Sequence, residues 1–101
     1  MGFYEKVWKQ CSKIPKGKVS TYKKIANSLG TTAYRAVGTA LSNNPYAPTV
    51  PCHRVVNSNG SLGGFMGEKT HPKKQMLLEK EGIEIVDNRI LNFKCKLFKF
   101  Q

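Results

Sequence analysis

The chain has 101 residues and 40% hydrophobic side chains, which suits one globular domain and excludes a disordered protein. No apolar run approaches the ~20 residues needed to span a bilayer, and we expect neither a membrane segment nor a signal peptide. A net charge of +11, from 17 Lys and Arg against 6 Asp and Glu, predicts a polyanionic partner, nucleic acid before a membrane surface.

The first predicted element is a helix over residues 3–13. Its apolar positions recur at helical spacing and are Phe3, Val7, Cys11 and Ile14. Pro15 and Gly17 end the helix, and the segment around them is a basic turn.

A second helix is predicted after Ser20 and Thr21, either of which can cap it. Its apolar positions are Tyr22, Ile25, Ala26 and Leu29. Gly30 follows as a C-terminal stop.

A third helix is predicted from about residue 33 to residue 42, with a cap in Thr31-Thr32. Its inward positions are Ala36, Val37, Ala40 and Leu41. Together the second and third helices form a helix-turn-helix pattern. The many small residues of the third helix suit a close approach to a partner or, alternatively, a tight contact between helices.

Residues 45–51 hold three prolines and predict a rigid loop that leads to Cys52. Residues 55–56 are expected to be extended before a turn at 57–60. Residues 60–67 are rich in glycine but lack the Lys-Ser/Thr of a phosphate loop, so a nucleotide site is rejected.

A fourth helix is predicted over residues 72–81, with Met76, Leu77 and Leu78 partly buried and Gly82 as its end. Residues 83–91 predict a hairpin around Asp87-Asn88. In the tail, the alternation of apolar residues and lysines from Phe93 onward predicts a further strand.

The three cysteines, Cys11, Cys52 and Cys95, are widely spaced and include no CxxC pair. This pattern argues against a disulfide framework and a structural zinc site, and for a reducing compartment. We interpret Cys11 and Cys95 as packing residues. Cys52 stands directly before His53, and the residues alone leave open whether it is a nucleophile or a buried side chain. On an extended chain these neighbours point in different directions, so a water bridge is expected between them.

Several motifs resemble those of one protein family and occur along the chain in the same order. The segment Pro51-Cys-His-Arg-Val55 resembles the active-site motif of O6-alkylguanine-DNA alkyltransferases. Residues 14–22, Ile-Pro-Lys-Gly-Lys-Val-Ser-Thr-Tyr, are similar to the family's entry into its helix-turn-helix. Further matching motifs are Tyr34-Arg-Ala-Val-Gly38, Asn44-Pro45 and Leu78-Glu-Lys-Glu-Gly82. The resemblance covers roughly residues 3–86 and leaves residues 87–101 unassigned.

The resemblance implies a mainly α fold with small β elements: a winged-helix-like helix-turn-helix DNA-binding domain with a C-terminal hairpin. It implies one domain over residues 1–101, and the N-terminal domain of longer family members is expected to be absent. The partner would be double-stranded DNA containing O6-alkylguanine, bound through the minor groove by a monomer. We expect no cofactor, no metal, no membrane contact, and a cytoplasmic or nucleoid-associated protein.

The resemblance also implies roles for residues. The DNA-binding residues would be Arg35 as the finger that replaces the flipped base, Tyr22 at the rotated phosphate, and Ala36, Gly38 and Thr39 on the recognition helix. The catalytic network would run from Cys52 through water to His53 and Glu81. The substrate pocket would be formed by Asn44, Pro48, Val55, Phe65 and Met66, with the Gly64–Met66 amides facing O6 and the Cys52 and Val55 carbonyls facing the guanine amino group. Attack by the thiolate on the alkyl carbon would give a stable thioether, so each protein would act once.

One departure and two alternatives follow. Phe65 stands where the family usually has a tyrosine, which removes a hydroxyl that assists the leaving base. One alternative is a lesion-binding protein of the alkyltransferase-like kind, but those proteins replace the cysteine that is present here. The other is a helix-turn-helix transcription regulator, which would give no role to His53 or Glu81. A thiol hydrolase ranks below both.

Overall fold

The computed structural model describes residues 2–46, 49–63 and 72–100. The helices are α1 (Phe3–Cys11), α2 (Tyr22–Ser28), α3 (Tyr34–Ser42), α4 (Pro72–Lys80) and α5 (Phe93–Lys96), with a 3₁₀ turn, η1, at Cys52–Arg54. The strands are β1 (Ser20–Thr21), β2 (Val55–Val56), β3 (Ile85–Val86) and β4 (Arg89–Ile90). The predicted fold class, mainly helical with small β elements, is confirmed. Within the described ranges, none of these helices is long and apolar enough to cross a membrane.

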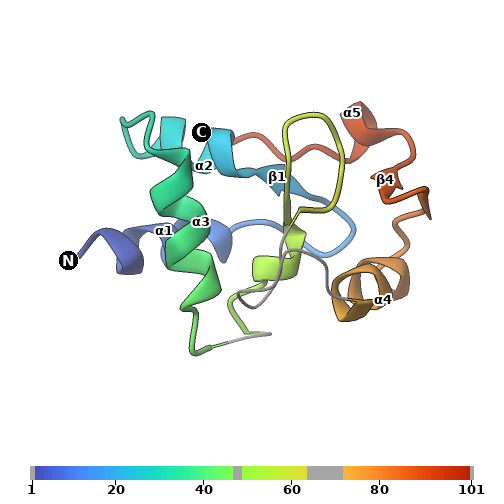
Figure 1. Cartoon of the computed structure of the whole chain (residues 1–101), viewed down its shortest axis with the longest axis horizontal. Helices are drawn as coiled ribbons and strands as arrows, with labels where there is room; N and C mark the ends of the chain where they lie inside the picture. The colour runs from blue at the N-terminus through green and yellow to red at the C-terminus, as the bar shows by residue number, and fades with distance from the viewer. Residues whose placement is uncertain (1, 47–48, 64–71, 101) are drawn as a thin grey trace.

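The three N-terminal helices gather at one end of the molecule, and α4, the β3–β4 hairpin and α5 form the other end (Figure 1). The larger core cluster lies under α1, α2 and α3 and includes Val7, Cys11, Ile25, Val37, Leu41, Cys52 and Val55. The smaller cluster joins Val19 and Val56 to Leu62, Leu78, Ile83 and Ile90. Cys52 therefore lies in the core of the helix-turn-helix unit, beside the junction of the two ends.

The helix-turn-helix forms where it was predicted, with one change in capping. Thr21 caps α2, because its hydroxyl accepts the Lys24 N–H at 3.0 Å, and Gly30 follows with a φ of +75°. The predicted Thr31-Thr32 cap of α3 is wrong. Ala33 is the N-cap without a side-chain bond, and the Thr31 hydroxyl instead accepts the Ala33 N–H within the turn.

A short parallel pairing joins two segments that are far apart in sequence. Ser20 of β1 lies opposite Val55 of β2, and Thr21 lies opposite Val56. The pairing fixes the chain that enters α2 against the chain that leaves η1. Local patterns predicted an extended piece at residues 55–56 but not its partner, since a two-residue ladder leaves no periodicity to detect.

The C-terminal end follows the predicted helix and hairpin. Gly82 terminates α4 with a φ of +89°, and Asp87 and Asn88 turn the hairpin at φ values of 51° and 62°. Such values are those of a type I′ turn, which matches the twist of paired strands. The prediction that Met76 is partly buried is wrong: it is 55% exposed, while Leu78 is fully buried.

The tail is not the predicted strand at its start. Phe93–Lys96 form the short helix α5, and Cys95 is exposed, so its interpretation as a packing residue is also wrong. The chain then becomes extended and pairs with Val19, which donates to the Lys96 carbonyl at 2.9 Å and accepts the Phe98 N–H at 2.7 Å.

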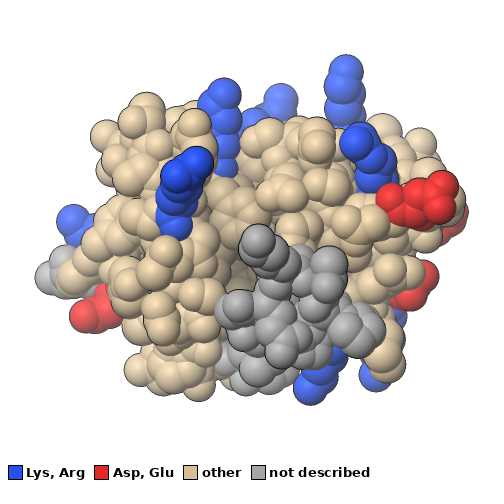
Figure 2. All heavy atoms as spheres, viewed as in Figure 1, with Lys and Arg blue, Asp and Glu red and all other residues tan. Residues whose placement is uncertain are grey.

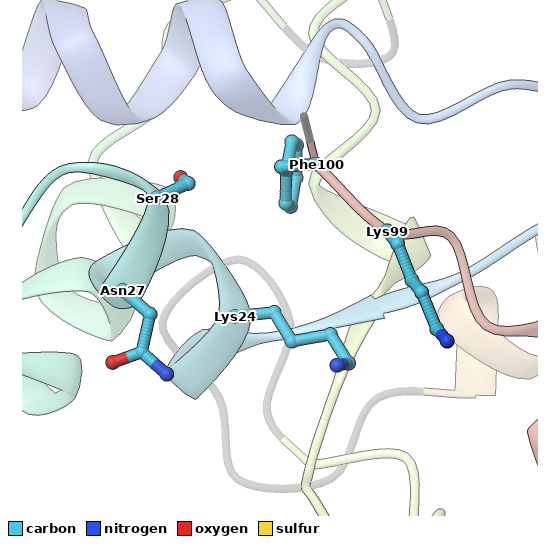
Figure 3. A pocket seen from close by; sticks show the side chains of 5 residues that line it. All are labelled: Lys24, Asn27, Ser28, Lys99 and Phe100. Carbon is cyan, nitrogen blue, oxygen red and sulfur yellow. The ribbon is translucent and has the colours of Figure 1, made fainter.

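From α5 the tail runs back to the helical end of the molecule (Figure 1). Phe98 and Phe100 pack against the larger core cluster, with their rings edge to face at 5.2 Å between centroids. Figure 3 shows Phe100 beside α2, in a hollow that it shares with Lys24, Asn27, Ser28 and Lys99. The tail thus extends the core of the helix-turn-helix unit.

Candidate active site

Cys52 and His53 lie on a tight turn rather than on the expected extended chain. The Cys52 N–H donates to the Val50 carbonyl at 2.8 Å, and the Arg54 N–H donates to the Pro51 carbonyl at 2.9 Å. Both functional side chains are buried, Cys52 with 6% of its surface exposed and His53 with 2%. The turn therefore holds a thiol and an imidazole in the protein interior.

Glu81 joins this turn from the end of α4, as the resemblance predicted. One carboxylate oxygen lies 3.2 Å from His53 Nε2, and Arg54 donates to both oxygens, from Nε at 2.9 Å and from Nη2. Arg54 also donates to the Ile14 carbonyl at 2.8 Å, which connects the network to the chain after α1. Burial acts to raise the pKa of Glu81, but the hydrogen bonds from Arg54 and His53 outweigh it and the pKa is lowered. The carboxylate is ionised at neutral pH.

This arrangement determines the tautomer of His53. Nε2 faces the Glu81 carboxylate and carries the proton, because a carboxylate can only accept. Nδ1 is buried and has no hydrogen-bond partner within the described part of the chain. Burial lowers the pKa of His53, and Arg54 adds to that effect. The imidazole is thus neutral, with a free lone pair on Nδ1 that can accept a proton.

Several groups act on the thiol of Cys52. Burial raises its pKa, while the Asn44 side chain, the Lys74 ammonium and nearby backbone N–H groups oppose this effect. Asn44 also holds the chain before this turn: its amide donates to the Val50 carbonyl at 3.0 Å and its oxygen accepts the Tyr46 N–H at 2.9 Å. The resting side chain is a protected thiol, and partners around it favour the thiolate.

Lys74 is a buried residue of the site that sequence reasoning missed. It is 1% exposed, and its Nζ donates to the Val55 carbonyl at 2.7 Å and lies 5.9 Å from the centre of the Tyr22 ring. Burial lowers its pKa to about 7. A signal was present, because Lys74 precedes the buried Leu78 by one helical turn and shares its face.

Tyr22 and Gly63 meet at the edge of the site. A Cβ built on Gly63 would lie 3.3 Å from the Tyr22 hydroxyl, and Gly63 has a φ of +72°. Glycine is required there by both backbone conformation and space. Tyr22 is half-buried, and burial raises its pKa to about 12, so it remains a neutral phenol.

The structure places the predicted DNA-binding residues of α3 on one accessible helix. Arg35 and Thr39 are exposed, and the Thr39 hydroxyl donates to the Arg35 carbonyl at 3.2 Å. Ala36 and Gly38 are half-buried, and a Cβ on Gly38 would be 4.0 Å from the Tyr22 ring. Gly38 thus fits the alternative of a tight contact between helices, with α2, while a close approach of α3 to a partner stays a prediction.

The predicted pocket residues are described only in part. Asn44 and Val55 lie on either side of η1, and the Val55 carbonyl is bound to Lys74. Pro48, Phe65, Met66 and the Gly64–Met66 amides lie outside the described residues. No group of three or more His, Cys, Asp or Glu in residues 2–46, 49–63 and 72–100 could hold a metal ion.

Comparisons with known proteins give matches over most of the chain. The family described as "6-O-methylguanine DNA methyltransferase, DNA binding domain" matches residues 2–83. A methylated-DNA–protein-cysteine methyltransferase of Saccharolobus islandicus is 54% identical over 79 residues, which are 78% of this chain and 50% of the relative. The Candida albicans protein of the same name is 45% identical over 80 residues, 79% of this chain and 44% of the relative. The chain spans about half the length of the curated relatives that it matches.

Solved structures show the same similarity. S. pombe Atl1, in complex with damaged DNA containing O6-carboxymethylguanine, superimposes with a TM-score of 0.85 at 35% identity, covering 96% of this chain and 94% of that one. Mycobacterium tuberculosis OGT, in complex with DNA, gives a TM-score of 0.74 at 43% identity, covering 80% and 50%. The match with Atl1 thus extends over nearly all of this chain, and the match with OGT over four fifths of it.

Proposed function

The chain belongs to the 6-O-methylguanine DNA methyltransferase family, and we propose on that premise that it repairs O6-alkylguanine in DNA by transferring the alkyl group to Cys52. The observation that carries the proposal is the buried thiol of Cys52 on a turn whose next residue, His53, is oriented by Glu81. A thiol beside a carboxylate-oriented imidazole is the arrangement that activates sulfur nucleophiles.

The reaction begins with the thiol. His53 Nδ1, through a water molecule, accepts the proton from Cys52, while Glu81 holds the other side of the ring. The thiolate attacks the alkyl carbon, so an S–C bond forms as the C–O6 bond breaks and the electron pair stays with the guanine. The proton ends on the base, which leaves as neutral guanine. The thioether has no leaving group as good as the guanine was, so the protein acts once.

Duplex DNA is the substrate, and α3 is the element that approaches it. The net charge of +11 attracts the phosphates without regard to sequence. Arg35 is exposed on α3 and can stack in the space that the flipped base leaves. Tyr22, at the edge of the site, contacts the rotated phosphate. Known complexes of the relatives Atl1 and OGT with DNA support DNA as the partner.

Lesion recognition without transfer is the second candidate. One observation favours it: S. pombe Atl1 superimposes on 96% of this chain with a TM-score of 0.85, compared with 80% and 0.74 for M. tuberculosis OGT. The presence of Cys52 beside an intact His53–Glu81 pair favours transfer instead.

Intact mass spectrometry distinguishes the two candidates. The protein is mixed with a duplex oligonucleotide that contains one O6-methylguanine, and we expect one methyl group per protein, located on Cys52 by peptide mapping. Cys52→Ser should gain none, and Cys95→Ser, which removes an exposed thiol, should behave as the parent does. An unmodified parent protein that still binds the lesion would establish the second candidate, and methylation at Cys11 or Cys95 would refute the assigned site.

A further inference from the structure

The hollow between α2 and the tail has no part in the proposed transfer of the alkyl group. It has a volume of about 340 Å³ and is lined by Lys24, Asn27 and Ser28 of α2 and by Lys99 and Phe100 of the tail. The three residues of α2 share one helical face, because they are three and four positions apart. In Figure 3 the Lys24 side chain extends from α2 toward the side of the hollow that carries Lys99. Two cations from segments that are far apart in the sequence therefore border one depression of the surface.

The extended conformation of the tail places Lys99 at this hollow. The Phe98 N–H donates to the Val19 carbonyl at 2.7 Å, and Phe98 and Phe100 both pack against the larger core cluster. Successive side chains of an extended chain point in opposite directions, so Lys99, between these two phenylalanines, points outward and is exposed. Packing of its neighbours thus determines where this cation stands.

The polar groups of the hollow can still accept a ligand. Within residues 2–46, 49–63 and 72–100, the ammonium groups of Lys24 and Lys99 and the side-chain amide of Asn27 form no hydrogen bond or ion pair. Ser28 differs, because its hydroxyl donates to the Ile25 carbonyl at 2.6 Å and accepts a hydrogen bond from Gln10 at 2.8 Å. The hollow therefore offers two positive charges and one amide donor.

No acidic residue lies in the segments that form the hollow. All six Asp and Glu residues are at position 5 or within residues 68–87, so residues 6–67 and 88–101 contain none. The first of these two segments holds nine Lys and Arg residues, and the second holds four. The electrostatic potential over the hollow is therefore positive, and the ligand that fits it is an anion.

A second hollow continues the first toward α3. Asn27 lines both, and the second hollow, of about 400 Å³, is otherwise lined by residues 30–32 of the turn before α3. From Lys24 to Ser28, α2 advances by about 6 Å, which corresponds to roughly two nucleotide steps of a DNA strand. A strand that passes the exposed Arg35 at the beginning of α3 can therefore continue across both hollows.

We propose that the hollow between α2 and the tail binds the sugar–phosphate backbone of duplex DNA, beside the stretch that α3 contacts. The proposal rests on the proposed function, because it takes DNA as the partner. Lys24 and Lys99 each pair with a phosphate, and Asn27 donates a hydrogen bond to the same strand. Contacts of this kind position a protein on the duplex and carry no sequence information. The tail then contributes to DNA binding as well as to the core.

Lys24→Gln and Lys99→Gln test this surface when affinity for duplex DNA is measured by fluorescence anisotropy at several salt concentrations. Each variant loses one phosphate contact, so we expect the slope of log affinity against log salt concentration to become shallower by about 0.9, and by about twice as much in the double variant. The loss of affinity should be the same for undamaged DNA and for DNA with one O6-methylguanine, since these contacts do not read bases. The rate of methyl transfer at saturating DNA should equal that of the parent.

Two matched controls remove one charge elsewhere. Lys94→Gln and Lys80→Gln change exposed lysines that do not line the hollow, and both should keep the slope of the parent, as should Lys99→Arg, which retains the charge. Chemical denaturation checks that every variant is folded, and the exposed Lys99 keeps the test valid if the half-buried Lys24 is needed for stability. Unchanged slopes for both variants of the hollow overturn the proposal, as does an equal change in all four Lys→Gln variants.

Failure of this proposal can be distinguished from failure of the proposed function. If Lys24→Gln and Lys99→Gln make the slope shallower while the parent takes no methyl group from the lesion, the surface is confirmed and only the transfer to Cys52 is refuted. If the parent is methylated at Cys52 while the slopes of both variants equal its own, the surface alone is refuted. A loss of affinity that is confined to DNA with the lesion also overturns the proposal, because it indicates a contact with the damaged base.

Discussion

Glu81 shows how much one residue can decide at this site. Its carboxylate binds Arg54 and also sets the tautomer of His53. Glu81→Gln removes the charge but keeps one acceptor oxygen, to which Arg54 is expected to donate. The amide nitrogen then faces Nε2 as a donor, which moves the ring proton to Nδ1, where it blocks acceptance of the thiol proton.

We expect Glu81→Gln to slow methyl transfer by about a hundredfold, the lower range for loss of a general base, with lesion binding retained. Single-turnover kinetics and a binding titration measure the two effects. Glu79→Gln, an exposed carboxylate on the same helix, is the matched control and should transfer at the parent rate. Equal rates for all three proteins would show that Glu81 serves only to anchor Arg54.

Arg35 is the residue that we propose acts on DNA, as a finger that fills the space of the flipped base. Base extrusion from a duplex is unfavourable by a few kcal/mol, and the finger offsets part of it, whereas a single strand has no stack to fill. Arg35→Ala should therefore slow transfer from duplex DNA more than transfer from single-stranded DNA carrying the same lesion. Lys80→Ala, which removes an exposed cation from α4, should slow both substrates equally or not at all. A loss for Arg35→Ala that is the same on both substrates is evidence against a finger.

At the scale of elements, the tail is the part whose contribution can be measured most directly. Phe98 packs on the core of the helix-turn-helix unit, although it lies 60 or more positions from most of that core. We expect Phe98→Ala to lower the free energy of unfolding by about 2 kcal/mol, less than a fully buried phenylalanine because the ring is only half-buried. Chemical denaturation measures the change.

Lys99→Ala, next to Phe98 and exposed, is the control and should stay within about 0.5 kcal/mol of the parent. If both variants are as stable as the parent, the tail rests on the helices without stabilising them.

Elements with strong local chemistry were predictable from the sequence. Thr21 caps α2 because its hydroxyl meets a free N–H, and Asp87-Asn88 turns the hairpin because both residues tolerate a positive φ. The prediction of a strand in the tail was wrong because local chemistry there is weak. Phe93 and the lysines after it alternate as a strand would, but four residues of alternation also fit one helical turn, and α5 is decided by tertiary packing.

The candidate site, like the fold, could be predicted from the sequence only in part. The motifs singled out Cys52, His53 and Glu81, and the structure places His53, the neighbour of Cys52, 3.2 Å from Glu81. Lys74 was not predictable. Lysine is almost never buried, and its position on the inward face of α4 was too weak a signal to overcome that expectation. Its burial depends on Tyr22 and on Val55, which are brought to α4 only by the fold.

For the whole molecule, we expect the net charge of +11 to govern the proposed encounter with DNA. Lys and Arg side chains project mainly along the upper edge of the face in Figure 2 and also at its left side and bottom, while acidic groups lie mainly at the right. Each phosphate contact contributes about 0.9 to the slope of log affinity against log salt concentration. We expect a slope of about −3 or steeper for undamaged duplex DNA, measured by fluorescence anisotropy over a range of salt concentrations. A slope near zero would place the basic residues away from the DNA.

The free energy of unfolding should vary with pH, and Lys74 should account for part of that variation. Burial lowers the pKa of Lys74 from 10.5 to about 7, so above pH 7 the unfolded chain binds more protons than the folded one and stability rises with pH. Above about pH 9 the buried thiols, whose pKa is raised in the fold, reverse this trend. The melting temperature of the parent should therefore rise relative to that of Lys74→Met between pH 7 and pH 9. Parallel curves for the two proteins would mean that Lys74 keeps its proton in the fold.

The pairing of Val19 with the tail has a consequence for the life of the protein before it is complete. Both hydrogen-bonding groups of the Val19 backbone are bound to Lys96 and Phe98, residues that the ribosome adds last among those described. During translation the first three helices are made early, but Val19, which precedes β1 and α2, lacks these partners until residues 96–98 have been added. We therefore expect a nascent chain that lacks residues 96–98 to be more prone to aggregation than one that includes them.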